Sequence, residues 1–507
     1  MSATRIRITA VALLLLAGVA RADDPPPDRF HVRLSLTGLY ATEQQDASPA
    51  EASQAAPYQL GFGELRGVVS GPLPGSLDIH LDGRVRLTGG FSTDTATVGG
   101  DQVTARGYLG GSEYEVRQAW LRWRGERVDA SLGRLLIPEA DALRIDGTRV
   151  GLRLGHVEVS AFGGSLPDPF SRSVTTDYTS APAFAGGAAV AWRFDRIWGS
   201  ISGVGLWLGG LDDGGPFDPT QPAGTPTTEG ARGYLTWTGF ERPFAWLDLF
   251  HDLVVDVGGP TRAELRRLDA LANVRLGSHV ALHLAYDHLS PWAIEMYLAR
   301  MLASRPDFLV GTIENNLTVE RTARDQGRVA IDATAGTFTA FAEGRLRRRS
   351  LVDPSSNPQF LVDGSDAAPS VAWDATVGLR DRGALLGLRP SLFYTYLDDM
   401  RARSHIVAAS LARSFLDERL EFEGQFLWAA TRDDGTGQPC DPTTPTAQLT
   451  SCFGDRDGNE YEAGMTITAS PSDHWLLYAD YRVVIDTTPG TPAILTHVAL
   501  LRVEARY

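Results

Sequence analysis

The sequence contains no lysine, only two cysteines, and no apolar run of 20 residues. Without such runs, and with a mean hydropathy of −0.13, the chain is not a bundle of membrane helices. An apolar content of 43% excludes a disordered chain. The net charge is −15, and the 47 cationic residues, all arginine, are scattered along the chain. This pattern lacks the basic patch of a nucleic-acid-binding protein, so we expect no nucleic-acid partner.

The N-terminus has the pattern of a targeting segment. Arg5 and Arg7 precede an apolar run over residues 8–19, and the small-residue motif Ala20-Arg21-Ala22 follows. This arrangement predicts a signal peptide over residues 1–22, cleaved after Ala22, and then a Pro-rich leader over 23–29. Export leads to an oxidising compartment.

The two cysteines are close in the sequence. Cys440 and Cys452 flank a stretch rich in proline and threonine. In an exported chain this spacing favours a disulfide that closes one loop over a metal or redox pair.

Most of the remaining sequence alternates with period two. Along residues 77–91 the apolar side chains Leu77, Ile79, Leu81, Val85, Leu87 and Phe91 fall on one face, and Asp78, His80, Asp82, Arg84, Arg86 and Thr88 fall on the other. The pattern recurs over residues 149–154, 328–333, 371–380, 419–428 and 475–485. Strict alternation of this kind predicts β-strands.

These strands are too long for an ordinary soluble sandwich. They extend over about 10–15 residues, the length that crosses a bilayer when tilted, whereas strands of soluble proteins average about 5–6 residues. Aromatic residues on the apolar faces near the strand ends fit interfacial girdles: Trp192, Phe194, Trp198, Trp237, Phe240, Trp475 and Tyr507. We therefore predict an all-β protein, a transmembrane antiparallel up-and-down β-barrel in the outer membrane. A secreted β-solenoid or sandwich is the alternative.

The links between strands alternate between short turns and longer polar stretches. Short turns are predicted at 241–243 and 470–472, among others, and long links at 41–57, 92–112 and 290–325, among others. The count gives 22 strands, with a range of 16–22, in one barrel over residues 30–507. Strand pattern begins near Phe30, so we expect no plug domain. The stretch 113–124 alternates poorly, and Arg117 and Arg122 cannot both be placed.

The chain ends with Leu501, Val503, Ala505 and Tyr507 on one face of a strand. A terminal strand that finishes on an aromatic residue resembles the signal read by the barrel-assembly machinery, which this resemblance implies as a partner. Most such barrels end in Phe, and Tyr507 departs from that.

One link resembles the third loop of the outer-membrane porins. It contains Gly133-Arg134, then Pro138-Glu139 and Asp141, in an order comparable to the porin loop, which follows a strand ending in Gly-Arg and folds into the lumen. The link is shorter than the usual porin loop. The resemblance implies a pore constriction at which Glu139, Asp141 and Asp146 face lumen arginines.

The arginines with the right parity are Arg84, Arg86, Arg149 and Arg153. Fixed charges on low-dielectric walls bias which ions enter a pore. The alternative is that these arginines and acids pair across strands and only keep the lumen wet.

A second basic set is predicted at the outer rim: Arg345, Arg347, Arg348 and Arg349, with Arg266, Arg267, Arg401 and Arg403. Guanidinium groups bind phosphate bidentately, so Arg347, Arg348 and Arg349 are candidate contacts for lipopolysaccharide. The alternative is a set of solvated charges at the base of a loop.

Three further patterns carry less information. Residues 290–305 follow helical spacing after Ser290 and Pro291, which predicts a short outer-loop helix, either a gate or a helix packed on its own loop. Asp455, Asp457 and Asn459 alternate as in calcium loops but lack the rest of that motif, so we predict no metal and no cofactor. No catalytic constellation is apparent, and we predict that the chain is not an enzyme.

We therefore expect a porin-like channel for passive diffusion of small polar or charged solutes, in contact with outer-membrane lipid. An export barrel for an extracellular polysaccharide, similar to the alginate exporter, is the first alternative. A barrel enzyme and a structural barrel closed by its loops are the others. The sequence leaves monomer and homo-oligomer open.

Overall fold

The computed structural model describes residues 30–45, 58–74, 76–89, 95–98, 101–104, 113–167, 183–208, 230–257, 263–290, 322–351, 370–383, 387–399, 402–433, 457–487 and 493–507. The predicted signal peptide, Cys440 and Cys452, Asp455, and the predicted helix after Ser290 lie outside these residues. The cleavage site, the disulfide, the outer-loop helix and the prediction of no metal near Asp455 therefore remain predictions.

The described residues form 24 strands and one short 3₁₀ turn. The strands are β1 (His31–Gln45), β2 (Tyr58–Leu73), β3 (Leu77–Gly89), β4 (Thr95–Val98), β5 (Asp101–Thr104), β6 (Glu113–Arg124), β7 (Val128–Ile137), β8 (Leu143–Leu154), β9 (Val157–Ser165), β10 (Ala183–Phe194), β11 (Ile197–Leu208), β12 (Gly230–Phe244), β13 (Leu247–Val257), β14 (Ala263–Arg275), β15 (Val280–Leu289), β16 (Thr322–Ala335), β17 (Phe338–Leu351), β18 (Ser370–Asp381), β19 (Leu388–Asp399), β20 (Ala402–Phe415), β21 (Leu420–Asp433), β22 (Gly458–Ser472), β23 (Trp475–Thr487) and β24 (Ile494–Arg506). The turn η2 covers Pro138–Ala140.

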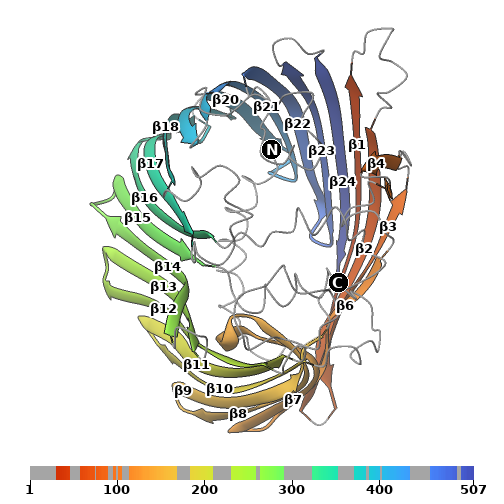
Figure 1. Cartoon of the computed structure of the whole chain (residues 1–507), viewed down its shortest axis with the longest axis vertical. Helices are drawn as coiled ribbons and strands as arrows, with labels where there is room; N and C mark the ends of the chain where they lie inside the picture. The colour runs from red at the N-terminus through yellow and green to blue at the C-terminus, as the bar shows by residue number, and fades with distance from the viewer. Residues whose placement is uncertain are drawn as a thin grey trace.

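Twenty-two of the strands form one closed antiparallel sheet, and β4 and β5 pair only with each other. Each strand of the large sheet pairs with its neighbour in chain order, and β24 pairs with β1 to close the ring, as Figure 1 shows. The predicted all-β, up-and-down barrel of 22 strands is confirmed. No helix in the described part of the chain is long and apolar enough to cross a membrane.

A buried carboxylate lies at the seam between the first and last strands. Glu504 of β24 is fully buried and pairs with Arg33 of β1 at 2.7 Å. The same carboxylate pairs with Arg502 and Arg506, each at 2.6 Å. Three guanidinium groups thus surround one acid where the ring closes.

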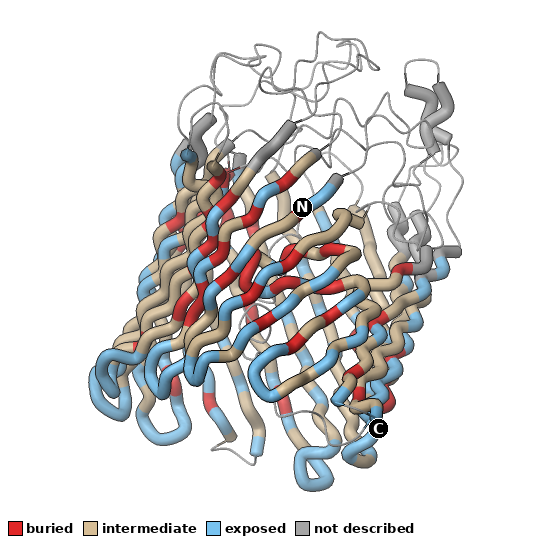
Figure 2. The backbone as a smooth tube through the Cα atoms, turned by 90° about the horizontal axis from the view of Figure 1, so that it is seen from below, coloured by how far each residue is buried: buried red, intermediate tan, exposed pale blue. Residues whose placement is uncertain are grey.

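Alternation separates an apolar outer face from a polar inner face. Figure 2 shows exposed and less exposed residues following one another along the strands. Large apolar side chains are exposed on the outer face, for example Leu34, Leu36, Leu65, Leu81, Leu87, Leu132 and Leu346. Their neighbours in sequence point inward. Contact between such an outer face and hydrocarbon carries no free-energy cost, whereas contact between the same face and water is unfavourable.

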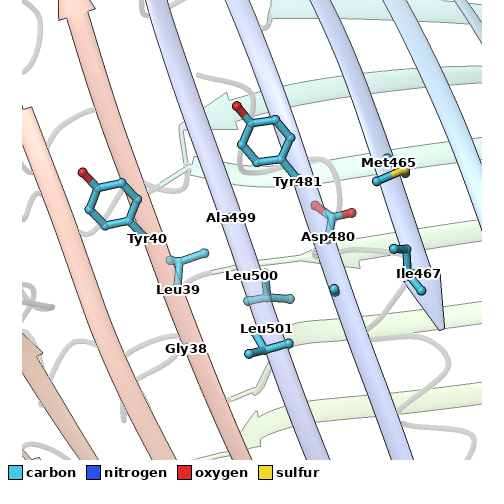
Figure 3. A pocket seen from close by; sticks show the side chains of 11 residues that line it. Gly38, Leu39, Tyr40, Met465, Ile467, Asp480, Tyr481, Ala499, Leu500 and Leu501 are labelled. Atoms are coloured by element: carbon cyan, nitrogen blue, oxygen red, sulfur yellow. The ribbon is translucent and has the colours of Figure 1, made fainter. Parts of the chain in front are cut away.

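The outer face includes a shallow apolar depression on β1, β22, β23 and β24. Figure 3 shows Tyr40 and Tyr481 on two sides of Ala499. Gly38, Ala479 and Ala499 supply little side chain, so the wall is thin there. The depression belongs to the lipid-facing surface.

Two turn predictions need correction, and both involve a bulge. The turns expected at 241–243 and 470–472 are strand: β12 continues to Phe244 and β22 to Ser472, with register shifts after Glu241 and after Ala469. Proline lacks the N–H that a ladder needs, and a bulge accommodates it without ending the strand. The poor alternation of 113–124 has the same origin, because Arg117 is the extra residue between the pairs Asp82–Gln118 and Gly83–Val116.

Candidate functional site in the barrel interior

The hairpin formed by β7 and β8 leaves the barrel wall and folds into the lumen. β6 pairs with β7 only as far as Arg134, and β9 pairs with β8 only from Asp146. The two strands of the hairpin continue to pair with each other up to Ile137 and Leu143, and η2 joins them. We call residues 135–145 the hairpin tip. Figure 1 shows it as an orange ribbon inside the wall, near β11.

Glycines permit the departure from the wall. Gly133 has a φ of +129°, and a Cβ there would lie 2.1 Å from the carbonyl oxygen of Ala119. A Cβ on Gly147 would lie 2.1 Å from the carbonyl oxygen of Gly163. A side chain at either position would therefore collide with a neighbouring backbone. The sequence has glycine at the two positions where the hairpin separates from the wall.

The hairpin tip packs on an apolar part of the inner wall. Its buried side chains are Leu135, Ile137, Ala140, Leu143 and Ile145, and they form one cluster with Phe162, Ala185, Ala189, Val204, Leu206, Tyr234 and Val254 of β9–β13. Ile137, Ala140 and Ile145 are 0% exposed. This cluster is a hydrophobic core inside the barrel, and it fixes the tip against one side of the lumen.

Polar anchors hold the end of the tip. The hydroxyl of Tyr234 donates to the carbonyl oxygen of Ala140 at 3.1 Å. The hydroxyl of Thr236 donates to the carbonyl oxygen of Glu139 at 2.7 Å. The carboxylate of Asp141 pairs with Arg267 of β14, which also pairs with Asp252. The tip is therefore tied to β12 and β14 as well as packed on β9–β13.

The predicted constriction residues meet in ion pairs around the base of the tip. Arg149 is 12% exposed and pairs with Glu139 at 2.8 Å, Glu158 at 2.6 Å and Asp129 at 3.6 Å. Asp146 receives two hydrogen bonds of 2.7 Å from the guanidinium of Arg134. The carboxylates of Glu139 and Asp146 thus each lie against a guanidinium, in line with the alternative that lumen charges pair across strands.

The other predicted lumen arginines lie on the same inner face. Arg84 pairs with Glu115 at 2.7 Å and with Glu64 at 3.2 Å. Arg153 donates to the carbonyl oxygen of Gly125 at 3.2 Å. Arg86 stands opposite Glu64 in the register, and its side chain lies outside the described residues.

The predicted outer-rim set is divided by strand alternation. Arg347 points into the lumen, where it pairs with Asp374 at 3.5 Å, so it is not an outward contact for lipopolysaccharide. Arg348, in the next position, shares the outer face with Leu346. The side chain of Arg349 lies outside the described residues. Arg267 also points inward, because it reaches Asp141 of the tip.

Sequence reasoning did not find the wall residues that hold the tip. Tyr234, Thr236 and Arg267 are about 100 residues or more from their partners in the chain. A register shift between Val254 and Val255 changes the alternation beside Arg267. The signal available was the unusual set of small or hydroxyl side chains on the inner faces of β10–β12.

Two aromatic residues assigned to the membrane girdle face the lumen instead. Trp198 and Phe240 are paired across β11 and β12. They have the parity of Ser202 and Thr236, whose hydroxyls bond to each other beneath the tip. Their rings stack at 5.7 Å with an interplanar angle of 18°. Trp237, with the opposite parity, is 44% exposed on the outer face.

No group of three or more potential metal-ligating side chains occurs within the described ranges. No family model matches the chain, and no curated protein matches it. Solved structures do match. A mutant of the ferric enterobactin receptor PfeA from Pseudomonas aeruginosa aligns with a TM-score of 0.52 and 10% identity, over 96% of this chain and 81% of that one.

The siderophore receptor PirA from Pseudomonas aeruginosa aligns similarly, with a TM-score of 0.50 and 11% identity, over 96% of this chain and 81% of that one. The chain folds as an outer-membrane β-barrel. At this identity the likeness concerns the fold alone. It carries neither the ligand nor the transport step of those receptors to this chain.

Proposed function

We propose that this outer-membrane barrel is a channel for passive diffusion of small polar or charged solutes, and not an enzyme. The observation that supports it best is the inner wall. Ion-paired arginines and acids follow the inner faces of β1–β3, β6–β8 and β14–β18. The described part of the chain covers the wall with the hairpin tip only along β9–β13. A wide barrel with such a wall favours an aqueous path beside the tip.

The paired charges also give the path an electrical character. Many guanidinium groups on the wall balance one or more carboxylates, as Arg84 balances Glu64 and Glu115. Removing one cation leaves its carboxylates uncompensated beside a low-dielectric wall, where their potential extends into the lumen. Ion selectivity should therefore depend on individual arginines and not only on the net charge of the wall.

The test is single-channel recording of the purified, refolded protein in a planar bilayer under a KCl gradient. We expect steady openings, and a shift of the reversal potential toward cation selectivity when Arg84 and Arg86 are replaced by Gln. Arg413→Gln is the matched control, because Arg413 lies beside Phe415 on the exposed outer side of β20. A protein that is folded but silent would contradict the proposal. Unchanged selectivity in the double variant would contradict the role of the arginines.

A further inference from the structure

An apolar row crosses the inner wall close to the short turns. Trp198 stands opposite Phe240, Phe240 opposite Phe250, and Phe250 opposite Leu271. The row lies toward the turn end of β11–β14, whereas the hairpin tip covers the other half of this wall, around Val204 and Tyr234. The four side chains are only partly buried, so within the described residues the row is an apolar inner surface that the hairpin tip does not cover. Such a surface inside a channel indicates contact with an apolar part of a solute.

Arginines surround the stacked rings. A cavity of about 500 Å³ is lined by Trp198 and Phe240 together with Arg153, Arg193 and Arg242. Arg193 stands directly opposite Trp198 in the register. The guanidinium carbon of Arg242 lies 5.7 Å from the centre of the Phe240 ring. Guanidinium groups beside partly exposed rings suit a ligand that is both flat and anionic.

The lining of this cavity carries three arginines and two acids, Glu158 and Asp195. One of the arginines, Arg242, pairs with Asp248 outside the lining. Glu158 is held by Arg149, from outside the lining, at 2.6 Å. The Nε of Arg153 is buried and has no hydrogen-bond partner among the described residues. A buried donor without a partner costs free energy, and an incoming carboxylate beside it would offset that cost.

We propose that this cavity is a binding subsite for a small aromatic carboxylate at the turn end of the channel. The ring of the solute would stack on Trp198 and Phe240, and Arg153 and Arg193 would bind its carboxylate. The subsite rests on the proposed function in one respect: it would give the proposed diffusion channel a preference for aromatic carboxylates. We call the five residues Arg153, Arg193, Trp198, Phe240 and Arg242 the aromatic–arginine subsite.

The test uses benzoate as the probe and acetate as its ring-free counterpart. Saturation-transfer NMR of the folded protein in detergent reports binding whether or not the channel opens. We expect benzoate to bind more tightly than acetate. The variant Trp198→Leu with Phe240→Leu should weaken benzoate binding roughly 2- to 12-fold and leave acetate unchanged. Arg153→Gln should weaken both.

Trp237→Leu is the matched control, because it removes the same ring from the outer face of β12 and should leave benzoate binding unchanged. Heat-dependent gel migration shows that each variant is folded. Equal binding of benzoate and acetate, or equal effects of the inward and outward leucine variants, would overturn the subsite. Openings in KCl with no benzoate binding would overturn the subsite alone, whereas benzoate binding to a silent barrel would overturn only the diffusion channel.

Discussion

The packing of the hairpin tip makes a quantitative prediction for Ile137. This side chain is 0% exposed, between the hairpin and the inner wall. Replacing it with Ala removes three buried carbon atoms, and such large-to-small changes in a core cost about 2–5 kcal/mol. Two hydrogen bonds anchor the end of the tip, each worth roughly 0.5–1.5 kcal/mol, so the tip should stay attached and the full cavity cost should appear. We therefore expect Ile137→Ala to lower the free energy of unfolding by at least about 2 kcal/mol.

The assay is denaturant unfolding of the refolded barrel in detergent, followed by tryptophan fluorescence and by heat-dependent gel migration. Leu136→Ala is the matched control, because Leu136 is the next residue of the same strand and is 37% exposed. We expect this control to cost less than Ile137→Ala, because the Leu136 side chain is only partly buried and its loss leaves no closed cavity. Equal costs for the two variants would refute the reasoning, because they would mean that the tip is not packed on the wall.

Three further predictions concern folding and the seam. Gly133→Ala should sharply reduce the yield of folded barrel, because its Cβ would lie 2.1 Å from a carbonyl oxygen, whereas Gly38→Ala, with no atom within 4 Å, should fold normally. Tyr234→Phe should lower stability by about 1 kcal/mol, the value of one hydrogen bond, and a cost near zero would show that the bond to the tip is not made. Glu504→Gln should cost about 1.5 kcal/mol, because three guanidinium groups lose their shared anion. High salt should narrow that difference in denaturant unfolding, and an unchanged difference would contradict its electrostatic origin.

The fold was predictable because period-two alternation indicates both where a strand lies and which of its side chains face the lumen. The stretch 77–91 alone places Asp82 and Arg84 on one side and Leu81 and Val85 on the other, as the structure does. The turn predictions at Pro243 and Pro471 were wrong, because a bulge lets β12 and β22 continue past each proline. A bulge at Arg117 likewise explains why the alternation of β6 could not be interpreted from the sequence.

The site was less predictable, because its contacts depend on how the ring closes in space. A porin-like short link over residues 133–147 was apparent in the sequence, and so was the parity of Arg149. The wall residues that contact the tip, Thr236 and Arg267, were not apparent in the sequence. Alternation indicates which side of the sheet a residue faces, but not which distant strand it contacts. Trp198 shows the same limit, because an aromatic residue near a strand end suits either face.

Closure of the ring at Glu504 has a consequence for the order of assembly. The contact between Arg33 and Glu504 joins positions 471 residues apart. For a flexible chain, bringing such ends together costs about 5 kcal/mol of configurational entropy beyond a constant. Neighbouring hairpins close far shorter loops, so they can form first, and β1 and β24 keep unpaired edges until the sheet between them has curved round. We therefore expect the seam to be the last contact to form, and the ion pairs of the buried Glu504 carboxylate then stabilise only the closed ring.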